Sequence, residues 1–195
     1  VLFRSLSVSI ATLPVAVLVA RVVSPLLREV GVRWADGRLA IAQERLVSSL
    51  LRARLMSVLT QQPGAARPRV LFATLSGEPH ELGLLGAALH AHDAGASVLY
   101  LGTGLPAVEL ATVAARLEAS AVAVSSIDPG HAPQALAELR ALDAALAPHV
   151  PVWLGGANAR YLAEAVGVER VQAVIDPGAL TALIRRRAAA RRTSR

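Results

Sequence analysis

The chain has 195 residues, of which 54% are hydrophobic, so it can bury the core of one full domain and a smaller appendage. It contains no cysteine, and all 20 basic residues are arginine, which excludes disulfides, thiolate metal sites and lysine Schiff bases. The net charge of +6 comes from six arginines in a basic C-terminal tail, residues 185–195, and the 3% aromatic content gives little support for nucleic-acid binding.

The N-terminal region begins with residues 1–12, which show no clean period. The apolar run from Val8 to Ala20, about 13 residues, is shorter than the roughly 20 residues that a helix needs to span a bilayer. A cleaved secretory signal is the minor alternative, and a buried helix the favoured one. We therefore expect a cytoplasmic protein without a membrane contact.

Two helices are predicted in this region. The first runs from Val15 to Val30, where apolar residues recur three and four positions apart, and Gly31 marks its end. Pro25 should kink this helix or mark a restart. The second runs from Arg38 to Leu59 and offers a stripe of apolar residues for burial. Together they predict a partial helical-bundle cap over residues 1–60.

Residues 61–68 have linker composition, with two prolines and a glycine. Beyond them, short apolar runs alternate with helix-like segments. The predicted strands are Val70–Leu75, Ser97–Leu101, Ala121–Ser126, Val152–Leu154 and Ala173–Ile175. The predicted helices are Leu84–Ala94, Pro106–Leu117, Pro133–Leu146, Asn158–Val166 and Gly178–Arg192, the last of which runs into the solvated basic tail. This alternation predicts an α/β domain over residues 69–184, a flavodoxin-like (Rossmann-like) doubly wound parallel five-stranded sheet in the order 2-1-3-4-5.

The segment after the first predicted strand reads S-G-E-P-H-E-L-G, from Ser76 to Gly83. His80 therefore lies at the carboxyl edge of the sheet, where ligands bind in open α/β folds. A loop histidine alone is more often a bystander than a ligand. Glu78 makes a ligand role more plausible, because its carboxylate can accept a hydrogen bond from one ring nitrogen and leave the other free for a metal.

Two further segments converge on the same edge. Ser125-Ser126-Ile127 follows the third predicted strand, and Gly155-Gly156 follows the fourth. These glycines and Gly83 remove side chains where a bulky group could enter between sheet and helix. A single imidazole beside such a slot does not suit zinc, which takes three or four protein ligands. It suits a cofactor that brings its own metal.

These three motifs resemble those of cobalamin-binding domains. Gly77 to Gly83 is similar to their Asp-x-His-x-x-Gly signature with Glu78 in place of aspartate, Ser125-Ser126-Ile127 resembles their serine motif, and Gly155-Gly156 their glycine pair. The resemblance implies base-off cobalamin with His80 as the lower axial cobalt ligand, its basicity tuned by Glu78. It also implies that the nucleotide tail lies beside the residues Gly83, Ser125, Gly155 and Gly156.

The helical segment resembles the cap of CarH-type, MerR-family photoreceptor regulators. Trp34, expected in the connection between the helices, is followed ten positions later by Glu44 in the second helix. The resemblance implies that Trp34 packs on an adenosyl group and Glu44 hydrogen-bonds to it, which favours adenosylcobalamin over methylcobalamin. The alternative is a core tryptophan and a solvated glutamate. Arg45 stands where the family has the histidine of its Glu-His pair, and Ala35 stands where light-responsive members have a histidine.

The resemblance thus implies a cobalamin-binding sensor or regulatory module of a light- or B12-responsive transcriptional regulator, and no enzyme. A homo-oligomer is expected, with DNA contacted only through an N-terminal domain that this chain lacks or through a partner protein. The alternatives are a corrinoid carrier protein of a methyltransferase system and a flavodoxin-like interaction domain without a cofactor. A cap that recognises adenosyl favours the sensor, whereas a carrier needs a cap that swings away from cobalt.

The remaining histidines are predicted to have other roles. His90 and His92 are expected at the surface, and His131 and His149 in or near loops without a metal. The two Asp-Pro-Gly sequences, at residues 128–130 and 176–178, are typical of turns and helix starts.

Overall fold

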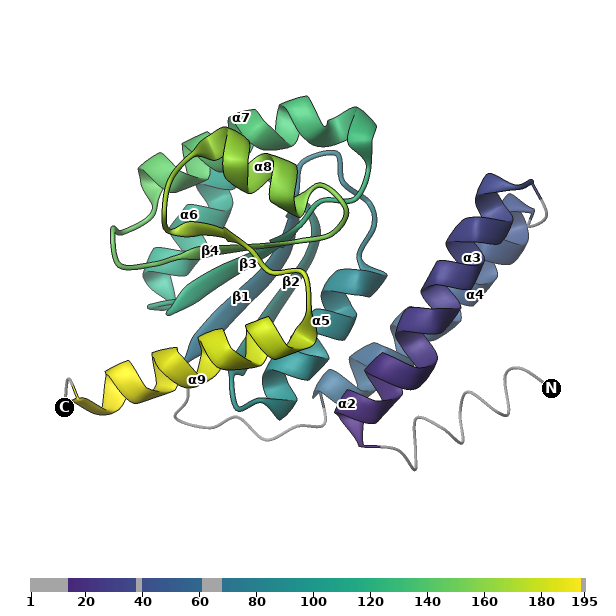
Figure 1. Ribbon diagram of the computed structural model, residues 1–195, viewed down its shortest axis with the longest axis horizontal. Helices are drawn as coiled ribbons and strands as arrows, with labels where there is room; N and C mark the ends of the chain where they lie inside the picture. Colours follow the sequence, from purple (N-terminus) through teal and green to yellow (C-terminus); the bar gives the residue numbers. More distant parts are fainter. Residues whose placement is uncertain (1–13, 38–39, 61–67, 194–195) are drawn as a thin grey trace.

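The computed structural model describes residues 14–37, 40–60 and 68–193. Its centre is a five-stranded parallel sheet in the order β2-β1-β3-β4-β5 (Figure 1). The strands are β1 Arg69–Leu75, β2 Ser97–Leu105, β3 Ala121–Ser125, β4 Val152–Gly155 and β5 Val171–Ala173. The predicted fold class and strand order are confirmed.

Helices cover both faces of the sheet, which is why its strands read as continuous apolar runs. One face carries α6 Ala107–Arg116, α7 Ala132–Ala145 and α8 Ala159–Val166, preceded by the short 3₁₀ helix η2 Pro129–His131. The other face carries α5 Leu82–Asp93 and α9 Pro177–Thr193. In β3, Val122 and Val124 pack towards the first face, while Ala121 and Ala123 pack towards the second.

Helix α5 lies between two cores, and this explains why its sequence is apolar nearly all round. Leu84 and Ala88 pack on the sheet with α9. Leu85 and Leu89 point the other way and pack against buried residues of the N-terminal helices, namely Leu18, Val19, Val23 and Leu55. The N-terminal helices are therefore attached to the α/β fold through α5, the helix that follows residues 76–81.

The N-terminal segment consists of α2 Val15–Leu18, a π-helical turn η1 Val19–Val23, α3 Ser24–Ala35 and α4 Ile41–Thr60. Figure 1 shows α3 and α4 side by side, extending away from the sheet. The restart expected at Pro25 is confirmed, because the π-helical turn ends directly before α3 and Pro25 is the second residue of that helix.

The predicted end of the first helix at Gly31 is wrong. Helix α3 continues through Gly31 to Ala35, so Trp34 lies in its last turn and not in the connection. A glycine inside a helix costs only about 1 kcal/mol, which neighbouring contacts can offset. One such contact spans the glycine, because Arg33 Nε donates to Glu29 Oε1 at 2.6 Å.

Two strands differ from their predicted bounds. β5 begins two residues before the predicted Ala173, because Val171 pairs with Val152 of the short strand β4. Ile175 is consequently 56% exposed in the loop before α9. β2 continues four residues past the predicted Leu101, with register shifts against β1 and with Gly102 and Gly104 at positive φ, where an irregular ladder admits glycine.

Some predictions fall on residues that the structure does not describe. The irregular lead-in and nearly all of the linker lie outside the described residues, in 1–13 and 61–67. Within the described ranges, no helix combines the length and apolarity needed to cross a membrane. Because nearly all of the predicted linker lies outside the described residues, the domain boundaries stay predictions.

Candidate functional site

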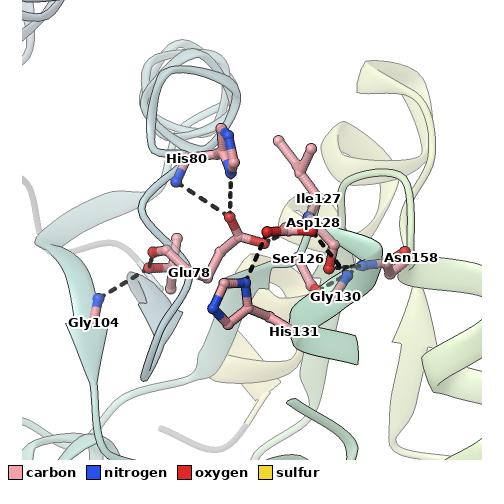
Figure 2. A network of polar contacts seen from close by, with 10 residues as sticks. Glu78, His80, Gly104, Ser126, Ile127, Asp128, Gly130, His131 and Asn158 are labelled. Carbon is pink, nitrogen blue, oxygen red and sulfur yellow. Dashed lines mark hydrogen bonds and ion pairs between the residues drawn. The ribbon is translucent and has the colours of Figure 1, made fainter. Parts of the chain in front are cut away.

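The carboxylate of Glu78 organises the loop after β1. We call residues 76–81 the His80 loop. Glu78 Oε2 accepts the backbone N–H groups of Ile127 at 2.6 Å and Asp128 at 3.0 Å, both in the loop after β3. Its Oε1 accepts the backbone N–H of His80 at 3.2 Å and its ring Nδ1–H at 2.5 Å (Figure 2). One side chain thus ties His80 to the neighbouring strand's loop.

The Glu78 carboxyl is ionised in this environment. The side chain is only 3% exposed, and burial alone would raise its pKa. The hydrogen bonds from Ile127, Asp128 and both N–H groups of His80 outweigh burial and lower the pKa below its ordinary value. An ionised carboxylate can only accept hydrogen bonds.

This charge state determines the tautomer of His80. Because Glu78 can only accept, Nδ1 of the imidazole carries the proton, and Nε2 keeps its lone pair. The His80 side chain is 52% exposed, so Nε2 is open to a ligand. A single imidazole of this kind suits a metal that brings its other ligands with it. Within the described ranges, no group of three or more His, Asp or Glu side chains could hold a metal ion.

Further hydrogen bonds join the ends of β1 and β2 to the His80 loop, and the loops after β3 and β4 to each other. Thr74 Oγ1 donates to the Glu78 carbonyl oxygen at 2.6 Å and accepts the Gly104 N–H at 3.0 Å. Asn158 Nδ2 donates to Ser126 Oγ at 3.1 Å and to the Asp128 carbonyl oxygen at 2.9 Å. Sequence reasoning missed these roles of Thr74 and Asn158. The position of Asn158, just after the Gly155-Gly156 pair, was the available signal.

His131 packs beside the His80 loop and is linked to Glu78 through Asp128 (Figure 2). Its Nδ1 lies 2.9 Å from Asp128 Oδ2, and a side chain at Gly77 would come within 2.8 Å of its ring. Asp128 Oδ1 also accepts the Gly130 N–H and so caps η2. The prediction that residues 128–130 start a helix is confirmed, as it is for Asp176, which accepts the Ala179 N–H at the start of α9.

A cavity of about 230 Å³, which we call the slot, opens between α5, the sheet and the start of α9. One wall is a helical stripe of α5, residues Gly83, Gly86, Ala87 and His90. The floor holds Ser125 and Gly155 near the carboxyl edge, and Phe72, Ala123 and Trp153 deeper in. Val19, Val23 and Ser24 contribute from the N-terminal segment. The wall and the floor both contain glycine and alanine, and these small residues leave the space between them open.

The glycines of the slot differ in what requires them. A Cβ at Gly83 would meet nothing within 4 Å, and one at Gly155 would meet only the Val124 carbonyl oxygen at 4.0 Å. Gly156 has φ +91°, and a Cβ there would lie 2.3 Å from the Ser126 carbonyl oxygen. The fold therefore needs glycine at 156. At 83 and 155 the missing side chain leaves room for a ligand.

Glu81, which sequence analysis did not single out, links the His80 loop to the helical segment. Its carboxylate accepts hydrogen bonds from Tyr100 Oη–H at 2.9 Å and from Arg52 Nε–H of α4. Burial, followed by the nearby charge of Glu81, raises the pKa of the Tyr100 hydroxyl far above its ordinary value. The residue next to His80 is thus in contact with α4.

The prediction that His90 lies at the surface is wrong. Its ring is half-buried between α5 and α9, where Nε2 lies 3.0 Å from the Pro177 carbonyl oxygen and 2.9 Å from Thr181 Oγ1. His90 also forms part of the slot wall, as Trp153 forms part of its floor. Neither position was distinguishable in the sequence, because each lies inside an apolar run.

The structure brings six of the predicted site residues to one edge of the sheet, namely Glu78, His80, Gly83, Ser125, Gly155 and Gly156. The other two belong to the helical segment, with Trp34 in the last turn of α3 and Glu44 in the first turn of α4. The side chains of Trp34 and Glu44 lie outside the described residues. Their contact with an adenosyl group stays a prediction.

Two family profiles match the chain. Residues 68–184 match the family described as B12 binding domain. Residues 6–58 match a second profile with the same description, which covers the helical segment. The first match covers the α/β fold, and the second includes the described residues of the helical segment up to residue 58.

Two curated proteins of Myxococcus xanthus are similar in sequence. The HTH-type transcriptional repressor CarH is 40% identical over 151 residues, which are 77% of this chain and 50% of the repressor. The HTH-type transcriptional repressor CarA is 39% identical over 146 residues, covering 73% of this chain and 48% of that protein. The chain spans about half the length of the curated relatives it matches.

A solved structure shares the fold. The monomethylamine corrinoid protein of Methanosarcina barkeri superimposes with a TM-score of 0.69 over 92% of this chain and 87% of that one, at 14% sequence identity. At this identity the likeness concerns the arrangement of helices and strands.

Proposed function

The chain belongs to the family of proteins with a B12 binding domain, and on this premise we propose that it is a cobalamin-binding sensor module of a transcriptional regulator. In this proposal it holds adenosylcobalamin in the base-off form, with His80 Nε2 as the lower axial ligand. The observation that carries the proposal is the pairing of an oriented imidazole with an open slot at one edge of the sheet.

The residues present fit the cofactor at its metal. Glu78 holds the Nδ1 proton of His80, so Nε2 presents its lone pair without a change of tautomer. The negative charge of Glu78 would also strengthen electron donation from the imidazole to cobalt. Since four backbone and ring N–H groups fix this carboxylate, His80 needs little rearrangement to act as a ligand.

The slot fits the nucleotide tail that base-off binding would release. Its wall of small residues on α5, with Gly83 facing open space, can accept a flat group between helix and sheet. Ser125 offers a hydroxyl on the floor. Bound cobalamin supplies a cobalt centre with a reactive alkyl bond; the chain's own residues orient the ligand and enclose the tail.

A sensor role is supported by the relatives and by one contact. Two similar proteins carry names that describe transcriptional repressors. Arg52 of α4 bonds to Glu81, the residue next to His80, so a shift of the His80 loop on binding would reach the helical segment directly. We place the response in this segment, with assembly into a homo-oligomer as its output and DNA contacted outside the chain.

A corrinoid carrier of a methyltransferase system is the second candidate. The likeness in fold to a monomethylamine corrinoid protein over most of both chains favours it. The two candidates differ in the alkyl group that they retain. A sensor of the proposed kind binds adenosylcobalamin more tightly than methylcobalamin and changes its assembly, whereas a carrier exchanges methyl groups with a partner enzyme.

The test is an absorbance spectrum of the purified chain with adenosylcobalamin in the dark and after green light, together with size-exclusion chromatography. The wild type should retain the corrinoid with a base-off, histidine-ligated spectrum. His80→Ala should lose that spectrum. His149→Ala, an exposed histidine away from the site, is the matched control and should behave as wild type.

Each outcome decides between the readings. A corrinoid-dependent change in size supports the sensor, and its dependence on green light would make the module a photoreceptor despite Ala35 and Arg45. Retention without any change in size, together with equal affinity for the methyl form, supports the carrier. A chain that retains no corrinoid refutes the proposed function.

A further inference from the structure

Trp153 occupies the deep part of the slot floor. Strand pairing places Phe72, Ala123 and Trp153 side by side across β1, β3 and β4, and all three line the slot. The residue between the two large rings is an alanine, whose side chain is a single methyl group. These three residues stand two or three positions before Leu75, Ser125 and Gly155, on the side of the slot away from the His80 loop.

The indole of Trp153 carries a donor without an acceptor. The residue is 2% exposed, and in the part of the chain that the structure describes Nε1 has no hydrogen-bond partner. A buried tryptophan N–H usually has a partner, and an unsatisfied buried donor is costly. A leucine or valine would fill this face of β4 without that cost. Trp153 lines the slot, so a ligand bound there is the group that could bring an acceptor to the ring.

Building on the proposed function, we infer that Trp153 Nε1–H donates a hydrogen bond to the nucleotide tail of the bound corrinoid. The tail carries acceptors of two kinds, a ring nitrogen on its base and oxygens on its ribose phosphate. The donor therefore favours corrinoids with a complete nucleotide tail over those that lack one. This role is separate from that of His80, which binds at the metal.

The test compares wild type and Trp153→Phe with three corrinoids in their adenosyl forms, by equilibrium titration in the dark. Cobalamin has the whole tail, a cobamide with a phenolic lower base lacks the ring nitrogen, and cobinamide lacks the nucleotide. Trp153→Phe should bind cobalamin roughly tenfold more weakly, the effect of one buried hydrogen bond, and cobinamide as tightly as wild type does. The phenolic cobamide locates the acceptor. If Trp153→Phe loses affinity for cobalamin alone, the acceptor is the ring nitrogen of the base. If it loses the same affinity for cobalamin and for the phenolic cobamide, the acceptor is on the ribose phosphate.

Phe72→Leu is the matched control, because it replaces a ring in the same row of the slot by a smaller apolar side chain without removing a donor. Its effect measures the affinity lost through packing alone. The inference is overturned when Trp153→Phe weakens cobalamin no more than Phe72→Leu does, or when it weakens cobinamide equally.

A measurement on the wild-type chain covers the case in which Trp153→Phe does not fold. The chain has two tryptophans, so its ¹⁵N spectrum contains two indole cross-peaks. Exchanging bound cobinamide for cobalamin changes only the tail, and one indole N–H should move downfield. Two unmoved indole cross-peaks contradict the inference.

The two hypotheses fail separately. A wild-type chain that retains no corrinoid refutes the proposed function, and the inference with it. If the wild-type chain binds cobalamin and Trp153→Phe binds it with the same affinity, only the inference is refuted.

Discussion

The two ends of the site are built in opposite ways. At the His80 loop, each oxygen of the Glu78 carboxylate accepts two N–H groups, and hydrogen bonds join the loops after β1, β3 and β4. The slot has small side chains, open space at Gly83 and an indole N–H that finds no partner among the residues that the structure describes. The polar groups at the first end are paired within the protein, whereas in the proposed function the bound ligand would fill the second.

This difference indicates how the two ends contribute to binding. A prearranged imidazole avoids the entropy cost of ordering a ligand residue during binding. The slot instead contributes through the absence of side chains. Substitutions at the His80 loop should therefore lower the stability of the empty protein, while substitutions that fill the slot should spare stability and remove affinity.

Filling the slot gives the largest expected effect. Gly83→Leu should lower the affinity for adenosylcobalamin at least about 1,000-fold, which is about 4 kcal/mol, because the new side chain occupies the space for the tail. The empty protein should stay at least as stable as wild type, since leucine favours a helix over glycine by roughly 1 kcal/mol. Corrinoid titration and thermal unfolding without corrinoid measure the two quantities. A variant that binds normally would show that the slot is not the binding space.

Gly156→Ala tests a glycine that the fold itself requires. Its positive φ and the 2.3 Å approach to the Ser126 carbonyl oxygen should lower the free energy of unfolding by about 2–3 kcal/mol. Urea unfolding without corrinoid gives the value. The adjacent Gly155→Ala is the control and should change stability by less than about 0.5 kcal/mol. Equal effects at the two positions would remove the distinction between them.

Glu78→Gln tests the prearranged end. An amide nitrogen cannot accept hydrogen bonds, so two of the four N–H groups around this side chain lose their acceptor. The free energy of unfolding should fall by about 2 kcal/mol, measured by urea unfolding at neutral pH. Glu164→Gln, at an exposed position on α8, should leave it unchanged. Unchanged stability in Glu78→Gln would contradict a loop that is complete without its ligand.

The contact between the two parts of the chain should have the smallest effect. Arg52 is 55% exposed, so solvent screens its ion pair with Glu81, and Arg52→Ala should cost only about 0.5 kcal/mol of stability. Its effect on the corrinoid-dependent change in size should be larger than on stability. Arg185→Ala, which removes an exposed charge from α9, serves as the control. An assembly that is identical in wild type and Arg52→Ala would separate Arg52 from the response.

The sequence by itself determined the alternation of strands and helices, the order of the strands and the gathering of Glu78, His80, Ser125 and Gly155 at one edge. These follow from local rules, because apolar runs, glycines and turn residues act over a few positions and parallel strands align their carboxyl ends. The pairing of Glu78 with His80 was predictable for the same reason, since only one residue separates them.

Only the tertiary structure decided the partners of the other site residues. Glu78 meets Ile127 across 49 positions, because helical crossovers bring the ends of β1 and β3 together. Glu81 meets Arg52 across 29 positions, because α4 packs against α5. The placement of Trp153 beneath the slot depends likewise on contacts made after the chain has packed. Local pattern shows where a residue stands in an element, and packing decides what it faces.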